Sequence, residues 1–220
     1  NVGVSLGLSS PRTISDVLLN DAHPADCIIN VSENFDAIVS STSLSSVEAD
    51  LIRVQEGRNR VLSHRMAPVS NYDVVILDCS PSLSVLNQNT LTYADHILIP
   101  VSCDYLSLVG VRNIMRTLRK INEVLLSQVD VIGVVPTFYG LSEQCTQETM
   151  RSLVAFFKDK VLHPIRVDPA LRQAPMHKQT IFEYAPESDG ASDYFNLAKQ
   201  LMVSIDKIDH QPSSKMETRR

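Results

Sequence analysis

Several features that often reveal a protein's class are missing from this chain of 220 residues. Its cysteines stand singly, with no Cys-x-x-Cys pair, so the sequence indicates neither a disulfide framework nor a zinc site. No apolar run approaches the roughly 18 residues of a membrane helix, and the first residues lack the charged-then-apolar profile of a signal peptide. We therefore expect a soluble cytoplasmic protein with reduced thiols at Cys27, Cys79, Cys103 and Cys145.

Common catalytic motifs are missing as well. The six histidines show no His-x-x-x-His spacing, and no Gly-x-Ser-x-Gly elbow occurs. No Gly-x-x-x-x-Gly-Lys-[Ser/Thr] loop or related Gly-Lys-Thr run occurs in the 220 residues either. Hydrolytic chemistry other than on a nucleotide therefore has no support in the sequence.

The residues that are present predict one α/β domain. Net charge is −5 and 44% of residues are hydrophobic, enough for a sizeable core. Apolar runs at 35–40, 73–78, 96–101 and 129–136 suit buried strands, and helical periodicity covers about 106–126, 143–158 and the residues after 188–190. This alternation indicates a doubly wound, mostly parallel sheet covered by helices on both faces. We assign residues 1–206 to the domain and 207–220 to a polar, disordered tail.

One acidic residue, Asp78, follows the apolar run DVVIL and precedes a Ser-Pro turn. In a parallel α/β sheet, ligands bind outside the carboxyl ends of the strands. A hydrophobic strand that ends in Asp is the Walker B pattern, in which the carboxylate helps to hold the Mg²⁺ of a bound nucleotide. Alternatively, Asp78 caps the next turn, since Asp, Ser and Pro are common at such junctions. The pattern alone leaves both interpretations open.

Longer segments carry a family resemblance. Residues 72–111 contain a strand ending in Asp, a Pro-Ser-Leu turn, an Asn-containing helix, an Ala-Asp pair and an apolar strand with Pro-Val. The segments VIGVVPTFY (131–139) and LRQAPMHKQTIFEYAPESDGASDYFNLAKQL (171–201) continue the pattern. In this order they resemble the ParA/Soj class of partition ATPases, of the ParA/MinD superfamily of deviant Walker A P-loop ATPases, over nearly the whole chain.

The resemblance implies a homodimeric ATPase that positions a plasmid, a chromosome or another cargo. Its cofactors would be ATP and Mg²⁺, with Asp78 as the catalytic and metal-binding carboxylate. Its partners would be non-specific DNA and a ParB-like or other adaptor protein, at the nucleoid and not at a membrane. Family members open with a strand-loop-helix-strand unit whose Gly-rich loop contains Lys and Thr. The segment NVGVSLGL resembles the residues that follow this unit, so the unit is not among the 220 residues. We therefore expect roughly 40 residues ahead of Asn1 and no ATPase activity from these 220 residues alone.

Further site residues follow from the resemblance. The family contacts the adenine base after its last strand and in a second loop, which correspond to Pro136, Thr137 and Asp168. The region that resembles the DNA-contacting surface contains Arg166, Arg172, Lys178 and Lys199. Another basic group lies on the predicted helix 106–126, where we expect a solvated face instead: Arg112, Arg116, Arg119 and Lys120.

Two other functions stay open. One is a non-catalytic interaction module without a phosphate-binding loop. The other is a MinD-like site-selection ATPase, which would need a C-terminal amphipathic helix that the segment SSKMETRR does not offer. A Gly-Lys-Thr loop encoded ahead of Asn1 would favour the partition ATPase.

Overall fold

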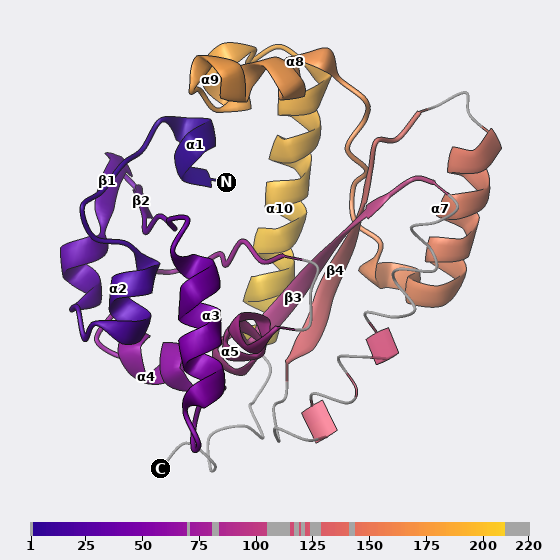
Figure 1. Ribbon diagram of the computed structural model, residues 1–220. Coiled ribbons are helices and arrows are strands. Elements are labelled where there is room, and N and C mark those ends of the chain that lie inside the picture. Colours follow the sequence, from indigo (N-terminus) through magenta and orange to yellow (C-terminus); the bar gives the residue numbers. More distant parts are fainter. Residues whose placement is uncertain are drawn as a thin grey trace. The chain divides into compact units, whose positions relative to one another are not determined.

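The structure is a computed structural model that describes residues 2–69, 71–80, 84–104, 115–116, 119, 122–123, 129–140 and 144–209. Its contacts group the chain into two compact units, which are described separately (Figure 1). Unit 1 comprises Asn1–Asp95, Arg116–Val129 and Ala174–Thr180. Unit 2 comprises His96–Met115, Asp130–Gln173 and Ile181–Arg220.

Unit 1 consists mainly of short helices around one core. Helices α2, α3, α4 and α5 pack against one another, and their apolar faces bury residues such as Val17, Leu51 and Leu62. Val47 and Leu51 are four residues apart on α3, so both reach this core from one face of the helix. Unit 1 includes the helical elements α1 (Val2–Leu6), α2 (Ile14–Leu19), η1 (Pro24–Cys27), α3 (Leu44–Arg53), α4 (Val61–Met66), α5 (Val85–Tyr93) and η3 (Ala174–His177).

A small hairpin completes unit 1. Strands β1 (Ile29–Ser32) and β2 (Phe35–Ala37) pair antiparallel, with Ile29 opposite Ala37. The strand predicted at 35–40 is thus confirmed only at Phe35–Ala37, and the parallel pairing expected for it is wrong. Its first three residues are extended, but they pair with the segment that directly precedes them, because a two-residue turn lets neighbouring strands meet at little entropic cost.

Unit 2 contains a parallel strand pair. Strands β3 (His96–Ser102) and β4 (Asp130–Thr137) pair in parallel, with Ile99 opposite Val134 and Ser102 opposite Thr137. The strands predicted at 96–101 and 129–136 are thus confirmed. A third segment runs beside β4, since parallel bridges join Val134 to Val161 and Tyr139 to Arg166. Most of β4 is buried, as is typical of a parallel sheet covered on both faces.

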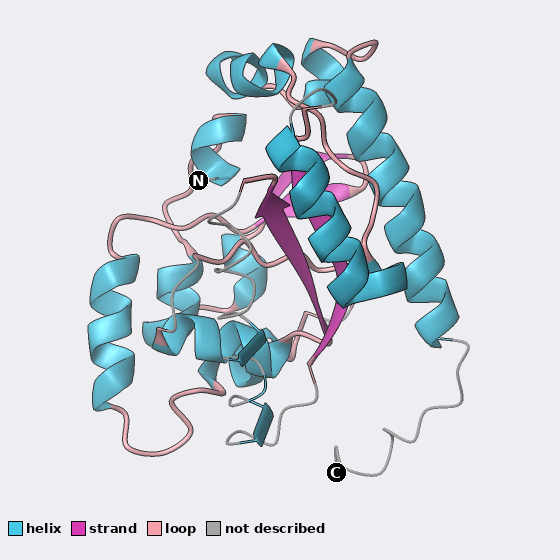
Figure 2. Cartoon of the chain, turned by 90° about the vertical axis from the view of Figure 1, so that its right-hand side faces the viewer, coloured by secondary structure: helices cyan, strands magenta, loops and turns pink. Residues whose placement is uncertain are grey.

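Helices flank these strands within unit 2. Helices α7 (Gln144–Phe157) and α10 (Asp189–Asp209) lie on either side of the β3–β4 pair in Figure 1, and Figure 2 shows α7 in front of the strands. Both helices were predicted, and both are confirmed. Shorter elements join them: η2 (Lys158–Lys160), α8 (Pro169–Gln173) and α9 (Ile181–Tyr184). Parallel strands with flanking helices make this an α/β fold, as the sequence predicted.

Two predictions fall at the limits of the described chain. The helix predicted over 106–126 lies largely outside the described residues, although the described positions 115–116, 119 and 122–123 are helical. Helix α10 continues to Asp209, so residues 207–209 of the predicted tail are helical, and residues 210–220 lie outside the described residues. No helix within the described ranges is long and apolar enough to cross a membrane.

Candidate functional site

The segment that leads to Asp78 is not a strand, so the strand predicted at 73–78 is wrong. Val74 and Val75 are each 46% exposed and Ile76 is 88% exposed, whereas Leu77 packs against the core of unit 1. An apolar run becomes a strand only where a neighbouring strand can exchange backbone hydrogen bonds with it. Within the described part of unit 1, the two strands present pair with each other instead.

The loop that carries Asp78 is nevertheless fastened to helix α5. Asn87 Nδ2 donates a hydrogen bond of 2.6 Å to the carbonyl of Ser80, and Cys79 Sγ lies 3.4 Å from Thr90 Oγ1. The side chain of Ser84 caps α5 by accepting a hydrogen bond from the N–H of Asn87. Asp78 is exposed between Leu77 and this tether. An exposed carboxylate on an anchored loop can act as an oxygen ligand for a hydrated cation.

In unit 2, three parallel segments end at a common edge. The Cys103 N–H donates to the Thr137 carbonyl (2.9 Å), and the Ile165 N–H donates to the Pro136 carbonyl (2.8 Å). The ring of Pro136 is fully buried, while the side chain of Thr137 is partly exposed. Of these two predicted base-contacting residues, Thr137 is therefore the one whose side chain can reach a ligand. Ligands of open α/β sheets bind at this carboxyl edge.

One residue at this edge was missed by the sequence reasoning. Phe138 directly follows β4, is 56% exposed and has a backbone φ of 52°. An aromatic residue rarely adopts the left-handed region, because its Cβ crowds the backbone there. The available signal was an aromatic residue immediately after a buried strand, in the position where a parallel sheet binds its ligands.

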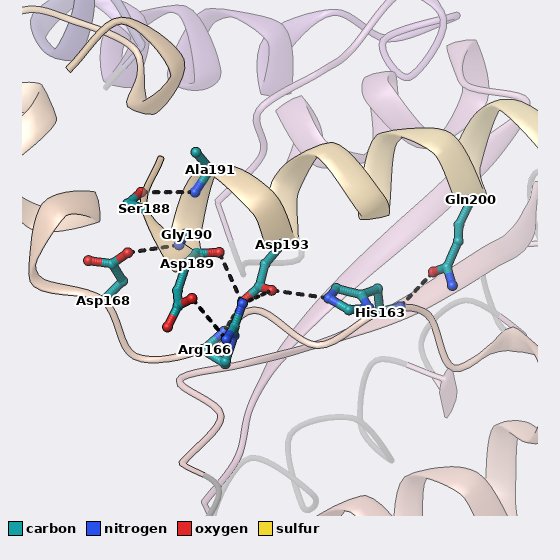
Figure 3. A network of polar contacts seen from close by, with 9 residues as sticks. All are labelled: His163, Arg166, Asp168, Ser188, Asp189, Gly190, Ala191, Asp193 and Gln200. Carbon is teal, nitrogen blue, oxygen red and sulfur yellow. Dashed lines mark hydrogen bonds and ion pairs between the residues drawn. The ribbon is translucent and has the colours of Figure 1, made fainter. Parts of the chain in front are cut away.

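Asp168 has a capping role (Figure 3). Its carboxylate accepts hydrogen bonds from the backbone N–H groups of Ala170 (2.8 Å) and Gly190 (2.7 Å). These bonds join the starts of α8 and α10. The hydrogen bond from Gly190, followed by smaller contributions that include Ala170 and Ser188, keeps the pKa of Asp168 below its usual range despite partial burial. A contact between Asp168 and the adenine base stays a prediction.

Beside it lies a buried carboxylate, Asp193, which is 1% exposed. Arg166 donates to it from Nε (2.9 Å), Nη2 (2.8 Å) and the backbone N–H (2.9 Å), and His163 Nε2 lies 3.1 Å away (Figure 3). Burial acts to raise the pKa of Asp193, but the hydrogen bonds from Arg166 and His163 outweigh burial and lower the pKa to about 2. Asp193 thus fixes the third parallel segment to helix α10.

The four predicted DNA-contacting residues differ in their availability. Arg166 is occupied by Asp193 and by Asp189, whose Oδ1 lies 3.0 Å from Arg166 Nη1. Arg172 is exposed in the last turn of α8. The exposed Lys199 places its Nζ 4.3 Å from the ring centre of Phe195.

Lys178, the fourth residue, belongs to unit 1. It is exposed and has a φ of 56°. Its side-chain carbons lie against Gly7, where an added Cβ would come within 2.6 Å of Lys178 Cδ. Because the stem packs in this way, the ammonium group is carried at a defined place on unit 1.

Comparison with known proteins decides the family. Residues 1–131 match the family described as AAA domain, and residues 72–218 match the NifH/frxC family of 4Fe-4S iron sulfur cluster binding proteins. Over 195 residues the chain is 32% identical to the sporulation initiation inhibitor protein Soj of Bacillus subtilis, covering 88% of this chain and 77% of that relative. The chain belongs to the ParA/Soj family of partition ATPases. The resemblance inferred from its motifs is confirmed.

Solved structures agree on the fold of this ParA/Soj chain. It superposes with a TM-score of 0.75 and 26% identity on cobyrinic acid a,c-diamide synthase from Mycobacterium smegmatis with a bound ATP analogue and magnesium, over 92% of this chain and 77% of that one. It also matches apo McdA from Cyanothece with a TM-score of 0.79, over 90% of this chain and 82% of that one. Identity to McdA is 19%, so that match supports the fold alone. The P-loop NTPase-like α/β class is thereby confirmed.

The residues of this ParA/Soj chain fit only part of a Mg²⁺–ATP ligand. Among the described residues, no three His, Cys, Asp or Glu side chains are grouped to hold a metal ion. Asp78 suits the usual Mg²⁺ arrangement, in which one or two carboxylates act beside phosphate oxygens and water. The 220 residues contain no Gly-Lys-Thr loop, however, and that loop supplies the N–H groups and the ammonium that surround the phosphates.

Proposed function

We propose that this chain is the domain of a partition ATPase that positions a plasmid, a chromosome or another cargo in the cytoplasm, at the nucleoid. It would act through ATP-dependent homodimerisation, non-specific DNA binding and a ParB-like or other adaptor. The observation that carries the proposal is the 32% identity to Bacillus subtilis Soj across 88% of the chain. The domain would span residues 1–206, as the sequence suggested.

Within this function, each candidate residue has a distinct role. When bound, Mg²⁺ neutralises phosphate charge, and Asp78 would orient one of its water ligands from the loop tethered to α5. Thr137 would face the nucleotide base at the carboxyl edge, whereas Asp168 would hold that edge through its caps. Arg172, Lys178 and Lys199 would contact DNA phosphates. Arg166 leaves this set, because its donors are taken by carboxylates.

Nucleotide binding tests the first role. Since the phosphate cradle is not among these 220 residues, calorimetry of the isolated chain is expected to detect no micromolar affinity for Mg²⁺–ATP. Micromolar affinity would contradict this reasoning. A chimera that adds a Gly-rich loop unit with Lys and Thr, of the kind with which family members open, ahead of Asn1 is expected to hydrolyse ATP.

In that chimera, Asp78→Ala should lower Mg²⁺-dependent turnover while the circular dichroism spectrum stays unchanged. Asp73→Ala is the matched control, since Asp73 is an exposed acid on the same segment. Equal turnover in the two variants would remove Asp78 from the metal site.

DNA retention tests the second role. Arg172→Glu combined with Lys178→Glu should abolish duplex binding in gel shifts of the ATP-loaded chimera without weakening nucleotide binding. Arg116→Glu with Arg119→Glu is the control, because both arginines are exposed on the helix expected to be solvated. Greater damage from the control pair would move the DNA-contacting surface to that helix.

A non-catalytic interaction module is the second candidate retained from the sequence analysis. The reading frame ahead of Asn1 distinguishes the two. A Gly-Lys-Thr loop there supports the ATPase, and a frame without one supports the module.

A further inference from the structure

Positive charge is concentrated in one short part of residues 1–95. That stretch contains eleven acidic residues, five arginines and no lysine, and four of the five arginines lie within residues 53–65. We call residues 53–65 the arginine segment. It contains one acid, Glu56, so its net charge is +4 − 1 = +3 in an otherwise acidic stretch.

The arginine segment joins two helices of unit 1. It runs from the last residue of α3, through residues 54–60, into α4. Gly57 makes the bend with a φ of 71°, and a Cβ at this position would meet nothing within 4 Å. Arg53, Arg58 and Arg60 are exposed. The bend therefore presents guanidinium groups to solvent from a surface turn.

Two polar side chains of α5, one of them buried, hold the backbone of this turn. Asn89 is 1% exposed, and its Oδ1 accepts from the N–H of Leu62 (3.0 Å) while its Nδ2 donates to the carbonyl of Arg58 (2.7 Å). Thr92 Oγ1 donates to the carbonyl of Asn59 (2.5 Å). A buried amide that is fully hydrogen-bonded fixes the chain it contacts, because breaking these bonds would strand polar groups away from water. A charged loop that is only solvated does not require such hydrogen bonds to its backbone, whereas a binding surface gains from them.

The arginines of the segment differ in whether they form ion pairs. Arg53 pairs with Asp50 (3.0 Å), and Arg65 pairs with Asp21. Arg58 forms no ion pair with any residue in the described ranges. The turn thus combines a backbone held by hydrogen bonds with a guanidinium group, that of Arg58, that forms no ion pair within the described ranges.

Phosphate is the ligand chemistry that this surface matches. Guanidinium groups bind phosphate oxygens through two parallel N–H donors, and preorganised donors lose less entropy on binding. The arginine segment contains no Phe, Tyr or Trp, the residues that anchor most protein–protein interfaces. We propose that the arginine segment, centred on Arg58 and Arg60, contacts the phosphate backbone of duplex DNA as a second contact surface. This inference rests on the DNA binding proposed above.

The test measures binding of the ATP-loaded chimera described above to a fluorescent 30-base-pair duplex between 50 and 200 mM salt. Arg58→Ala combined with Arg60→Ala should reduce the slope of log K against log[salt] by about 2 and weaken binding roughly 50-fold at 0.1 M salt. Arg12→Ala with Arg151→Ala is the matched control, since both arginines are exposed and the charge change is identical. The control should leave the slope unchanged, and both variants should keep the wild-type circular dichroism spectrum.

A contact measurement separates the possible outcomes. Phenylglyoxal modifies exposed arginines, and duplex DNA should protect Arg58 and Arg60 in peptide mass spectra but leave Arg151 reactive. DNA binding without this protection, or with equal slopes in both variants, overturns the inference and leaves the proposed function standing. No DNA binding by the ATP-loaded chimera without these substitutions overturns both. Protection by poly-glutamate but not by duplex would assign the surface to an acidic protein partner instead.

Discussion

Replacing the buried carboxylate of Asp193 by an amide is expected to cost much of the stability of unit 2. Asp193 is 1% exposed, and it holds Arg166 and His163 to helix α10. Asp193→Asn removes the charge and turns an N–H₂ group toward donors that need an acceptor. Breaking one partner of a buried ion pair is costly because the other charge stays buried without compensation.

The magnitude follows from the pKa. The pKa of Asp193 falls from 3.8 to about 2 on folding, and each unit corresponds to about 1.4 kcal/mol. The charged form thus contributes about 2 kcal/mol to the free energy of unfolding. Because the folded pKa is the lower one, this contribution is complete above the unfolded pKa of 3.8 and is lost as the pH falls toward 2.

Urea titrations followed by far-ultraviolet circular dichroism suit this chain, which contains no tryptophan. Asp193→Asn should lower the free energy of unfolding by at least about 2 kcal/mol at pH 7. The difference from wild type should shrink between about pH 4 and pH 2. Asp189→Asn is the control on the same helix and the same arginine, and its 69% exposed side chain should cost no more than about 0.5 kcal/mol. Equal losses in the two variants, or a difference independent of pH, would refute the reasoning.

Three further outcomes are expected. Asn89→Ala should lower the free energy of unfolding in urea titrations by about 3 kcal/mol, because it leaves the backbone groups that Asn89 binds in the arginine segment without a partner. A loss below about 1 kcal/mol would contradict the role of Asn89 in holding this turn. Gly133→Ala should cost about 2 kcal/mol, since the new Cβ would lie 2.3 Å from Leu162 Cδ1, and a stability equal to wild type would show that this side chain moves aside. Burial, with smaller contributions from Asp104 and Cys145, raises the pKa of Cys103 to about 11. Maleimide at pH 8 should therefore label the exposed Cys145 before Cys103, and equal labelling rates would contradict the burial of Cys103.

The sequence predicted the helices and strands that a pattern of neighbouring apolar residues is enough to indicate. Strands β3 and β4 were found because each is a continuous apolar run, although only β4 is buried along most of its length. Helices α7 and α10 were found because their apolar residues recur at helical spacing. The run at 73–78 has the same composition but forms no strand. Composition can show that a segment suits a strand, but the hydrogen bonds come from a partner that composition does not specify.

The candidate site was less predictable for the same reason. The role of Asp168 depends on Gly190, which lies 22 residues further along the chain, and the role of Arg166 depends on Asp193, 27 residues away. One local signal existed, since Asp168 precedes Pro169 at the start of α8, where Asp followed by Pro marks a helix N-terminus. No comparable signal marks Asp193, because an acid in an amphipathic helix gives no sign that its own side chain is buried.

Arg166 and Arg58 show why positive charge alone does not identify a DNA contact. Arg166 lies in the region that resembles the family's DNA-contacting surface, yet two carboxylates already occupy its donors, so a phosphate would have to compete with a buried aspartate. Arg58 lies outside that region, but its carbonyl is held by Asn89 while its guanidinium forms no ion pair within the described chain. A phosphate contact requires a positioned backbone together with an available charge. By that criterion the arginine segment is a stronger candidate for a phosphate contact than Arg166.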